Sequence, residues 1–161
     1  SVFLPAILAG LADPDDNVKR NAAFCAGVSC EGLGDYVAGD YGQLLQAVGQ
    51  LFGIDHTASE TSAAAVDNAC ACFSRMIMSS PTNVPLPQVL PVMLSKMPLK
   101  NDQTENETVY KCLLGLLQMN HADVMTVKAE MKRVFTEATA EGSKVDVETQ
   151  QKLKMALPAL G

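Results

Sequence analysis

Two asparagines and three acidic residues carry chemistry suited to holding another polypeptide. Asn21 and Asn68 lie 47 residues apart, and each directly precedes an alanine. A side-chain amide both donates and accepts hydrogen bonds, so it can pair with the N–H and C=O groups of an extended peptide. Asp67, Glu105 and Glu107 offer carboxylates to the ammonium group of a lysine. These residue types predict a site for a basic, extended segment.

Each of these residues also has a simpler interpretation. A recurring asparagine can form hydrogen bonds between neighbouring helices, and we weigh that role equally with peptide binding. Carboxylates at a helix N-terminus often only cap it or oppose its dipole, each contributing about 0.3–1 kcal/mol, which would account for Asp13, Asp16 and Asp102. This does not explain Asp67, which is expected in the middle of a helix. A solvated acidic face is the remaining alternative. Tyr110 offers a flat surface to a lysine stem, or lies at the edge of the core.

Catalytic and metal-binding patterns are weak in this sequence. The five cysteines include Cys70 and Cys72, whose spacing of two points them to different faces of a helix, so they do not chelate one metal easily. His56 and His121, the only histidines, have no cysteine at a ligand spacing. No glycine-rich phosphate loop accompanies them. We therefore expect no metal, no cofactor and no enzyme activity, with the cysteines as small buried side chains in a reducing compartment.

Charge is distributed unevenly along the 161 residues. Eighteen acidic side chains against twelve basic ones give a net charge of −6, and the first sixty residues hold eight acids and two bases. This balance argues against binding to nucleic acid through bulk charge and favours basic partners. No apolar run approaches the roughly 18 residues that a membrane helix needs. Hydrophobic residues make up 48% of the chain, a share typical of a folded protein.

The elements that must position these residues are all helices. Apolar residues recur at helical spacing between turns rich in Asp, Gly and Pro, and no long stretch alternates with a period of two. We expect eight helices, and we expect Asp146 to cap the last of them. Their predicted ranges are 2–12, 17–31, 40–54, 59–79, 86–96, 101–119, 122–141 and 146–157.

The predicted helices form pairs that repeat. Ala22 and Ala69 match at a separation of 47 residues, and Pro5 and Pro91 match at 86 residues, which is two periods of 43. A two-helix unit with a period of about 40–47 residues is typical of HEAT repeats. Such units stack into an α-α superhelix with one continuous core. We predict an all-α solenoid of about four repeats at 1–36, 37–81, 82–121 and 122–161, with apolar surface exposed at the Ser1 end.

Two stretches carry a more specific resemblance. Residues 16–28 and several strings between 65 and 110 are similar to the C-terminal HEAT repeats of the importin-β family of nuclear transport receptors, and we interpret the chain as a fragment of such a receptor. The likeness covers about residues 1–120, and the last forty residues match only weakly. The strings that carry it include Asp67-Asn68-Ala69, Arg75-Met76-Ile77, Val89-Leu90-Pro91, Pro98-Leu99-Lys100-Asn101-Asp102 and Glu105-Asn106-Glu107. The Pro-Leu-Lys and Glu-Asn-Glu strings are the most specific, because a generic HEAT protein would not share them.

The resemblance implies a transport role. Members of the family are not enzymes; they carry cargo between cytoplasm and nucleus and release it when Ran-GTP binds, mainly to N-terminal repeats that this chain lacks. One branch carries histones and ribosomal proteins. The leading hypothesis is that basic cargo, such as a histone tail, binds an acidic concave face, with no direct contact to nucleic acid or membrane. The rival is a structural cap or spring that closes the superhelix. The expected cargo-binding residues are Asn21, Asp67, Asn68, Glu105, Glu107 and Tyr110.

Overall fold

The computed structural model describes residues 2–161, and these residues form helices joined by short links, with no β-strand. Short 3₁₀ helices, labelled η, connect several of the α-helices. The α-helices are α1 (Leu4–Leu11), α2 (Asp16–Leu33), α3 (Tyr41–Gly49), α4 (Glu60–Ser79), α5 (Leu86–Ser95), α6 (Asn106–Gln118), α7 (Ala122–Thr126), α8 (Lys128–Ala138) and α9 (Val147–Ala156).

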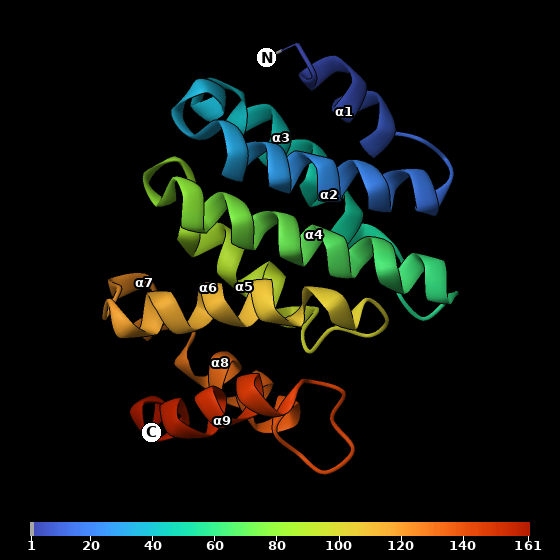
Figure 1. Ribbon diagram of the computed structural model, residues 1–161. Coiled ribbons are helices and arrows are strands. Elements are labelled where there is room, and N and C mark those ends of the chain that lie inside the picture. Colours follow the sequence, from blue (N-terminus) through green and yellow to red (C-terminus); the bar gives the residue numbers. More distant parts are fainter. Residues whose placement is uncertain (1) are drawn as a thin grey trace.

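The helices form pairs that stack into a layered array (Figure 1). In each pair we call the first helix A and the second helix B, so α1, α3, α5 and α8 are A helices, and α2, α4, α6 and α9 are B helices. The B helices pack in sequence order, α2 on α4, α4 on α6 and α6 on α9. The two chain ends lie at opposite ends of the stack. The structure therefore confirms the predicted all-α solenoid, while the exact repeat limits stay a prediction.

Local signals explain where several helices begin. Asp15 caps α2 by accepting a hydrogen bond from the backbone N–H of Asn17, and Ser59 caps α4 through Ser62. Asp146 caps α9 as predicted, with Oδ1 2.8 Å from the N–H of Thr149. Such caps satisfy backbone donors that have no partner inside the helix.

Small residues let α2 and α4 approach closely. A Cβ atom placed on Gly27 would lie 2.9 Å from Cδ of Arg75 and 3.2 Å from Cα of Cys72, closer than real Cβ contacts. Alanines 23, 26, 65 and 69 are fully buried and take up little room between the helices. Close approach of this kind buries α4 along nearly its whole length, from Ser62 to Ile77.

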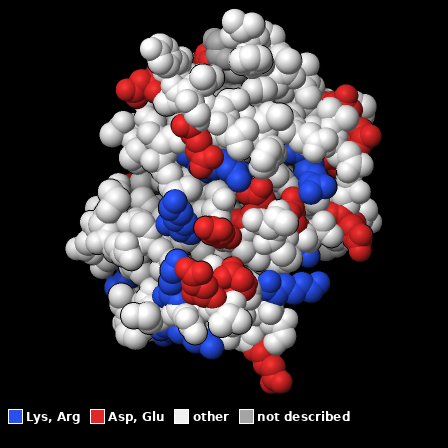
Figure 2. Space-filling model, in the orientation of Figure 1, with Lys and Arg blue, Asp and Glu red and all other residues white. Residues whose placement is uncertain are grey.

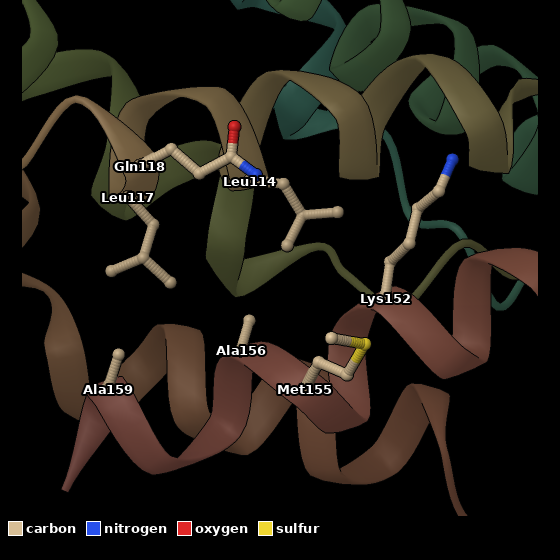
Figure 3. Close-up of a pocket in the computed structure, with 7 residues that line it drawn as sticks. All are labelled: Leu114, Leu117, Gln118, Lys152, Met155, Ala156 and Ala159. Carbon is tan, nitrogen blue, oxygen red and sulfur yellow. The ribbon is translucent and has the colours of Figure 1, made fainter.

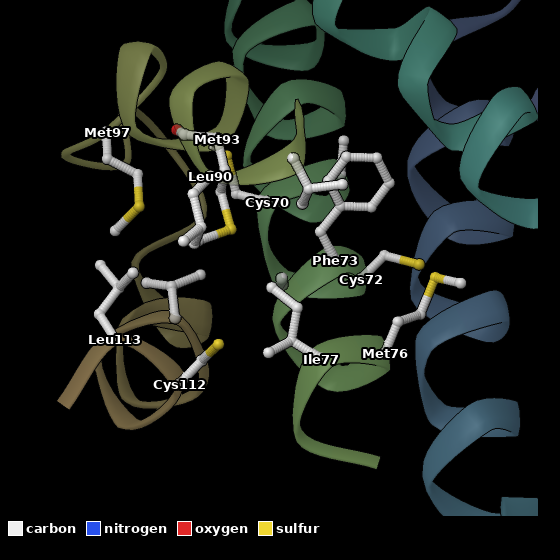
Figure 4. Close-up of a cluster of buried hydrophobic side chains, with 14 of the residues drawn as sticks. Cys70, Cys72, Phe73, Met76, Ile77, Leu90, Met93, Met97, Cys112 and Leu113 are labelled. Carbon is white, nitrogen blue, oxygen red and sulfur yellow. Dashed lines mark hydrogen bonds between the residues drawn. The ribbon is translucent and has the colours of Figure 1, made fainter. Parts of the chain in front are cut away.

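The core contains much sulfur and little aromatic surface. Figure 4 shows Cys70 from α4 beside Met93 from α5, with Cys112 from α6 on the same side of α4, whereas Cys72 and Met76 point to the side of α4 that faces α2. Burial raises the pKa of these three thiols, that of Cys112 to about 12. A protonated, buried thiol behaves as a small hydrophobic group.

Some predicted boundaries differ from the observed ones. The helix expected over 122–141 divides at Val127, whose buried side chain packs into the core while its backbone leaves helical geometry, with φ −118° and ψ 17°. The carbonyl of Val127 then accepts from the N–H of Met131 at 2.9 Å and starts α8. The segment Gly34–Asp40, expected to be a link, forms the 3₁₀ helix η1, which buries Val37.

The edge of the array at α1 and α2 is apolar, as expected near the Ser1 end. A hollow of about 490 Å³ lies there, lined by Phe3, Ile7, Val18, Asn21 and Cys25 among others. Within residues 2–161, no helix has both the length and the apolar character needed to cross a membrane.

Candidate functional site

The B helices present a polar face on which acidic and basic side chains are mixed. Figure 2, drawn in the orientation of Figure 1, shows red and blue side chains interspersed over this face. Many of them form contacts between consecutive B helices and the link before α6. We call this set the polar ladder, and it consists of Asp16, Arg20, Glu31, Ser62, Asp67, Asn68, Arg75, Asp102 and Glu105.

Asp67 holds the link between α5 and α6. Its Oδ1 accepts from the backbone N–H of Lys100 at 3.0 Å, and its Oδ2 accepts from those of Asn101 and Asp102, both at 2.7 Å. The side chain is buried, with Asp67 only 1% exposed. Hydrogen bonds from three N–H groups to one carboxylate are charge-assisted and strong. They explain why an aspartate occurs in the middle of α4.

Asp102 is where three parts of the chain meet. Its Oδ2 accepts from Nη2 of Arg20 on α2 and from Nδ2 of Asn68 on α4, each at 2.9 Å, and its Oδ1 accepts from Thr104 at 2.5 Å. Burial alone would raise the pKa of the Asp102 carboxyl, but these hydrogen bonds outweigh burial and hold that pKa below its usual value. Asp102 makes no side-chain cap for the helix that follows it, so the capping role expected for it is wrong.

Arg75 forms a second junction about two turns further along α4. Its Nη2 lies 2.7 Å from Oε2 of Glu105, and its Nε lies 3.4 Å from Oε2 of Glu31 on α2. The guanidinium carbon is also 5.2 Å from the centre of the Phe24 ring, within range of a cation–π contact. The interpretation that Arg75 pairs with an acid of a neighbouring repeat is confirmed.

Asp16 completes the ladder at the start of α2. Its Oδ2 accepts from the Ser62 hydroxyl at 2.8 Å, and its Oδ1 lies 3.1 Å from the Lys19 ammonium group. The hydrogen bond from Ser62, supported by Lys19, lowers the pKa of the Asp16 carboxyl. Asp16 therefore does more than oppose the helix dipole, because it joins α2 to α4.

The six residues predicted to bind cargo fall into two groups. Asn68, Asp67 and Glu105 are buried and bonded within the ladder. Tyr110 is buried as well, with its ring centre 6.2 Å from that of Phe135, which matches the core-edge interpretation. Asn21 and Glu107 are exposed. Cargo contact by any of the six stays a prediction, but only Asn21 and Glu107 present accessible side chains.

Asn21 and Asn68 have different surroundings despite their matched positions in the sequence. Asn68 faces the link before α6, where it donates to Ala64 and to Asp102. Asn21 lies on the open side of α2, beside the apolar hollow at the first edge of the array. No side-chain hydrogen bond to Asn21 appears within residues 2–161. The two asparagines therefore do not form a ladder of equivalent contacts.

A groove separates α6 from α9 and reaches the end of α4. Two adjoining hollows of about 540 and 350 Å³ share Leu114, Gln118 and Lys152, and a third of about 160 Å³ shares Met78 and Gly115 with the larger one. Figure 3 shows Leu114, Leu117 and Gln118 on α6 facing Lys152, Met155 and Ala156 on α9. We call this space the methionine groove, because Met78, Met119 and Met155 line it.

No group of three or more His, Cys, Asp or Glu side chains that could hold a metal ion occurs in the described part of the chain, residues 2–161. The five cysteines there are free thiols, four of them buried and Cys25 exposed. The candidate site is therefore a binding surface made of the polar ladder, its exposed neighbours and the methionine groove.

A row of helix pairs whose B helices stack in sequence order defines a HEAT-repeat solenoid. The chain belongs to the importin-β family, and within that family it is similar to importin-4. No protein-family model matches the chain.

Three curated relatives show this kinship. The probable importin subunit beta-4 of Schizosaccharomyces pombe is 32% identical over 128 residues, which are 80% of this chain and 12% of that protein. Importin-4 of Homo sapiens is 32% identical over 160 residues, or 99% of this chain and 14% of the human protein. Importin-4 of Mus musculus is 31% identical over 134 residues, or 83% of this chain and 12% of the mouse protein. The chain thus spans less than a sixth of the length of these relatives.

Proposed function

We propose that this chain is part of a nuclear import receptor that shuttles between cytoplasm and nucleus, and that it acts as a binding surface rather than as an enzyme. The names of the relatives support an import role. Contact of the full-length receptor with Ran-GTP belongs mainly to repeats outside this chain. The cargo is a basic, extended segment, such as the tail of a histone or a part of a ribosomal protein.

The uneven charge of the chain carries the proposal about cargo. The whole net charge of −6 lies in residues 1–60, because the remaining 101 residues hold ten acids and ten bases. Most of these acids lie in the links and in η1 around α2, α3 and the start of α4, so the α1–α4 end of the array attracts basic segments most strongly. Side chains free to meet them include Asn21 on α2, Glu60 on α4 and Glu107 on α6, all of which are exposed.

A titration with a fluorescent histone-tail peptide tests this function. Because the contacts are between exposed charges, we expect binding at low ionic strength that weakens at about 0.15 M salt. Glu60→Lys and Glu107→Lys should each weaken binding by about three- to tenfold at low salt. Glu130→Lys on α8 is the matched control, since it makes the same charge change at an exposed site on an A helix. Equal loss of affinity in all three variants would contradict a cargo site on the B-helix face.

Burial of the polar ladder favours a second candidate function, a structural role in the arch. The polar groups of three of the ladder's members form hydrogen bonds between helices and links: Asp67, Asn68 and Glu105. In that case the chain sets the spacing of the repeats while cargo is held elsewhere in the receptor. The histone-tail peptide would then bind at neither salt concentration, and only the stability of the chain would respond to changes in the ladder.

A further inference from the structure

We propose that the methionine groove binds an apolar peptide segment that carries carboxylates, a partner opposite in charge to the basic cargo proposed above. The groove lies between α6 and α9, at the end of the array away from the acidic residues 1–60. Its two larger hollows, of about 540 and 350 Å³, adjoin one another, which suits several consecutive side chains of a peptide.

The floor and walls of the groove are apolar and adaptable. Leu114 and Leu117 on α6 and Ala156 on α9 form its apolar surface, as Figure 3 shows. Met78, Met119 and Met155 line its length and are exposed by 36%, 66% and 84%. Unbranched thioether side chains adjust their shape to different apolar partners, which is a common property of peptide-binding surfaces.

The groove is open because the last B helix packs loosely on its neighbour. Gly115 on α6 has no atom within 4 Å of the position where a Cβ would stand, whereas Gly27 in the α2–α4 contact has no room for one. The helices α2 and α4, by contrast, are in contact along most of their length. The space left between α6 and α9 is open to a ligand.

Charge at the groove selects the partner. Three charged side chains line its larger hollow, Glu107, Lys111 and Lys152, and two of them are cations on opposite walls. Lys111 takes part in no ion pair within residues 2–161. Lys152 pairs only with Glu148, at 3.1 Å, and both side chains are more than half exposed, so this pair is easily exchanged for another carboxylate. A segment with carboxylates flanking apolar residues matches the two lysines, whereas a lysine-rich segment is repelled by them.

Two fluorescein-labelled hexapeptides test the proposal, one of alternating Leu and Glu and a twin with Lys at every Glu position. The full 161-residue chain should bind the Leu–Glu peptide at least about tenfold more tightly than its twin at low salt. Lys111→Glu combined with Lys152→Glu should remove that preference. Lys154→Glu is the control, because Lys154 is exposed on α9 but does not line the groove.

A second variant tests the location through shape rather than charge. Gly115→Met fills the groove at a position with open space, so the fold is kept while the Leu–Glu peptide loses affinity by about tenfold or more. Gly42→Met on α3, an exposed position that also has open space, should leave binding unchanged. Methyl resonances of ¹³C-labelled Met78, Met119 and Met155 should shift on peptide addition, while those of buried Met93 and Met97 stay in place.

The other outcomes overturn the proposal. If neither hexapeptide binds, or if both bind equally, the groove does not select a carboxylate-bearing segment. If the Leu–Lys twin binds more tightly and shifts the same methionine methyls, the groove is part of the basic cargo surface instead. Glu107 borders both surfaces, but failure of the histone-tail titration leaves this result unaffected, because the two peptides carry opposite charges and the methionine methyls report on the groove alone.

Discussion

At the scale of single residues, the same amino acid has two roles in this chain. Asn68 bridges α4 and the carboxylate of Asp102, whereas Asn21 is exposed on the open side of α2. We predict that Asn68→Ala lowers the free energy of unfolding by about 1–3 kcal/mol, because a buried carboxylate loses one of its donors. Asn21→Ala should change it by less than about 0.5 kcal/mol. Urea denaturation of both variants measures the difference, and equal effects would show that burial of Asn68 does not matter.

The carboxylate of Asp102 makes the stability of the folded chain depend on pH. Its pKa is lowered in the folded chain, so the stability it contributes is present above the unfolded pKa of about 3.9 and is lost as pH falls through the folded value. Asp102→Asn should therefore lower the free energy of unfolding at pH 7. The gap between variant and wild type in that free energy should become smaller below about pH 4. Urea midpoints at pH 7 and pH 3 check this, with the exposed Asp35→Asn as control. A gap that stays constant between the two pH values would contradict the role assigned to the charge.

At the scale of elements, the contact between α2 and α4 depends on the absence of a side chain at Gly27. A methyl group there would meet Cδ of Arg75 and the backbone of Cys72, and the backbone cannot give way cheaply. We expect Gly27→Ala to cost about 1–3 kcal/mol of stability. Gly32→Ala in the same helix, with open space around it, should be neutral or stabilising by up to about 1 kcal/mol. Thermal unfolding of the two variants compares them, and a Gly27→Ala chain as stable as wild type would mean that the helices slide apart freely.

The helices show which parts of this structure can be predicted from the sequence. Helix positions follow from local signals such as the caps Ser59 and Asp146, and those predictions agree with the structure to within a few residues. The break at Val127 has no local signal such as Gly or Pro, so the sequence pattern predicts one continuous helix there. Most contacts of the polar ladder also lie beyond a prediction from local pattern. Arg20 and Asp102 meet across 82 residues, and no local pattern fixes which faces of two stacked helices turn toward each other.

At the scale of the whole molecule, the chain combines a closely packed part with a more loosely packed one. The ladder joins α2, α4 and the link before α6, while the methionine groove opens between α6 and α9. Net negative charge gathers at the closely packed end, whereas residues 61–161 carry no net charge and expose methionines and lysines beside the groove. Under the two proposals above, the two ends bind different partners.

Asp67, together with the rest of the polar ladder, holds neighbouring repeats together. Amide hydrogen exchange followed by NMR measures this role, because the carboxylate of Asp67 accepts from the amides of Lys100, Asn101 and Asp102. We predict that Asp67→Ala speeds exchange at these three amides by about tenfold or more, while the exposed Glu107→Ala leaves them protected. Unchanged protection of the three amides in Asp67→Ala would contradict this role of Asp67 and leave its carboxylate available for cargo contact.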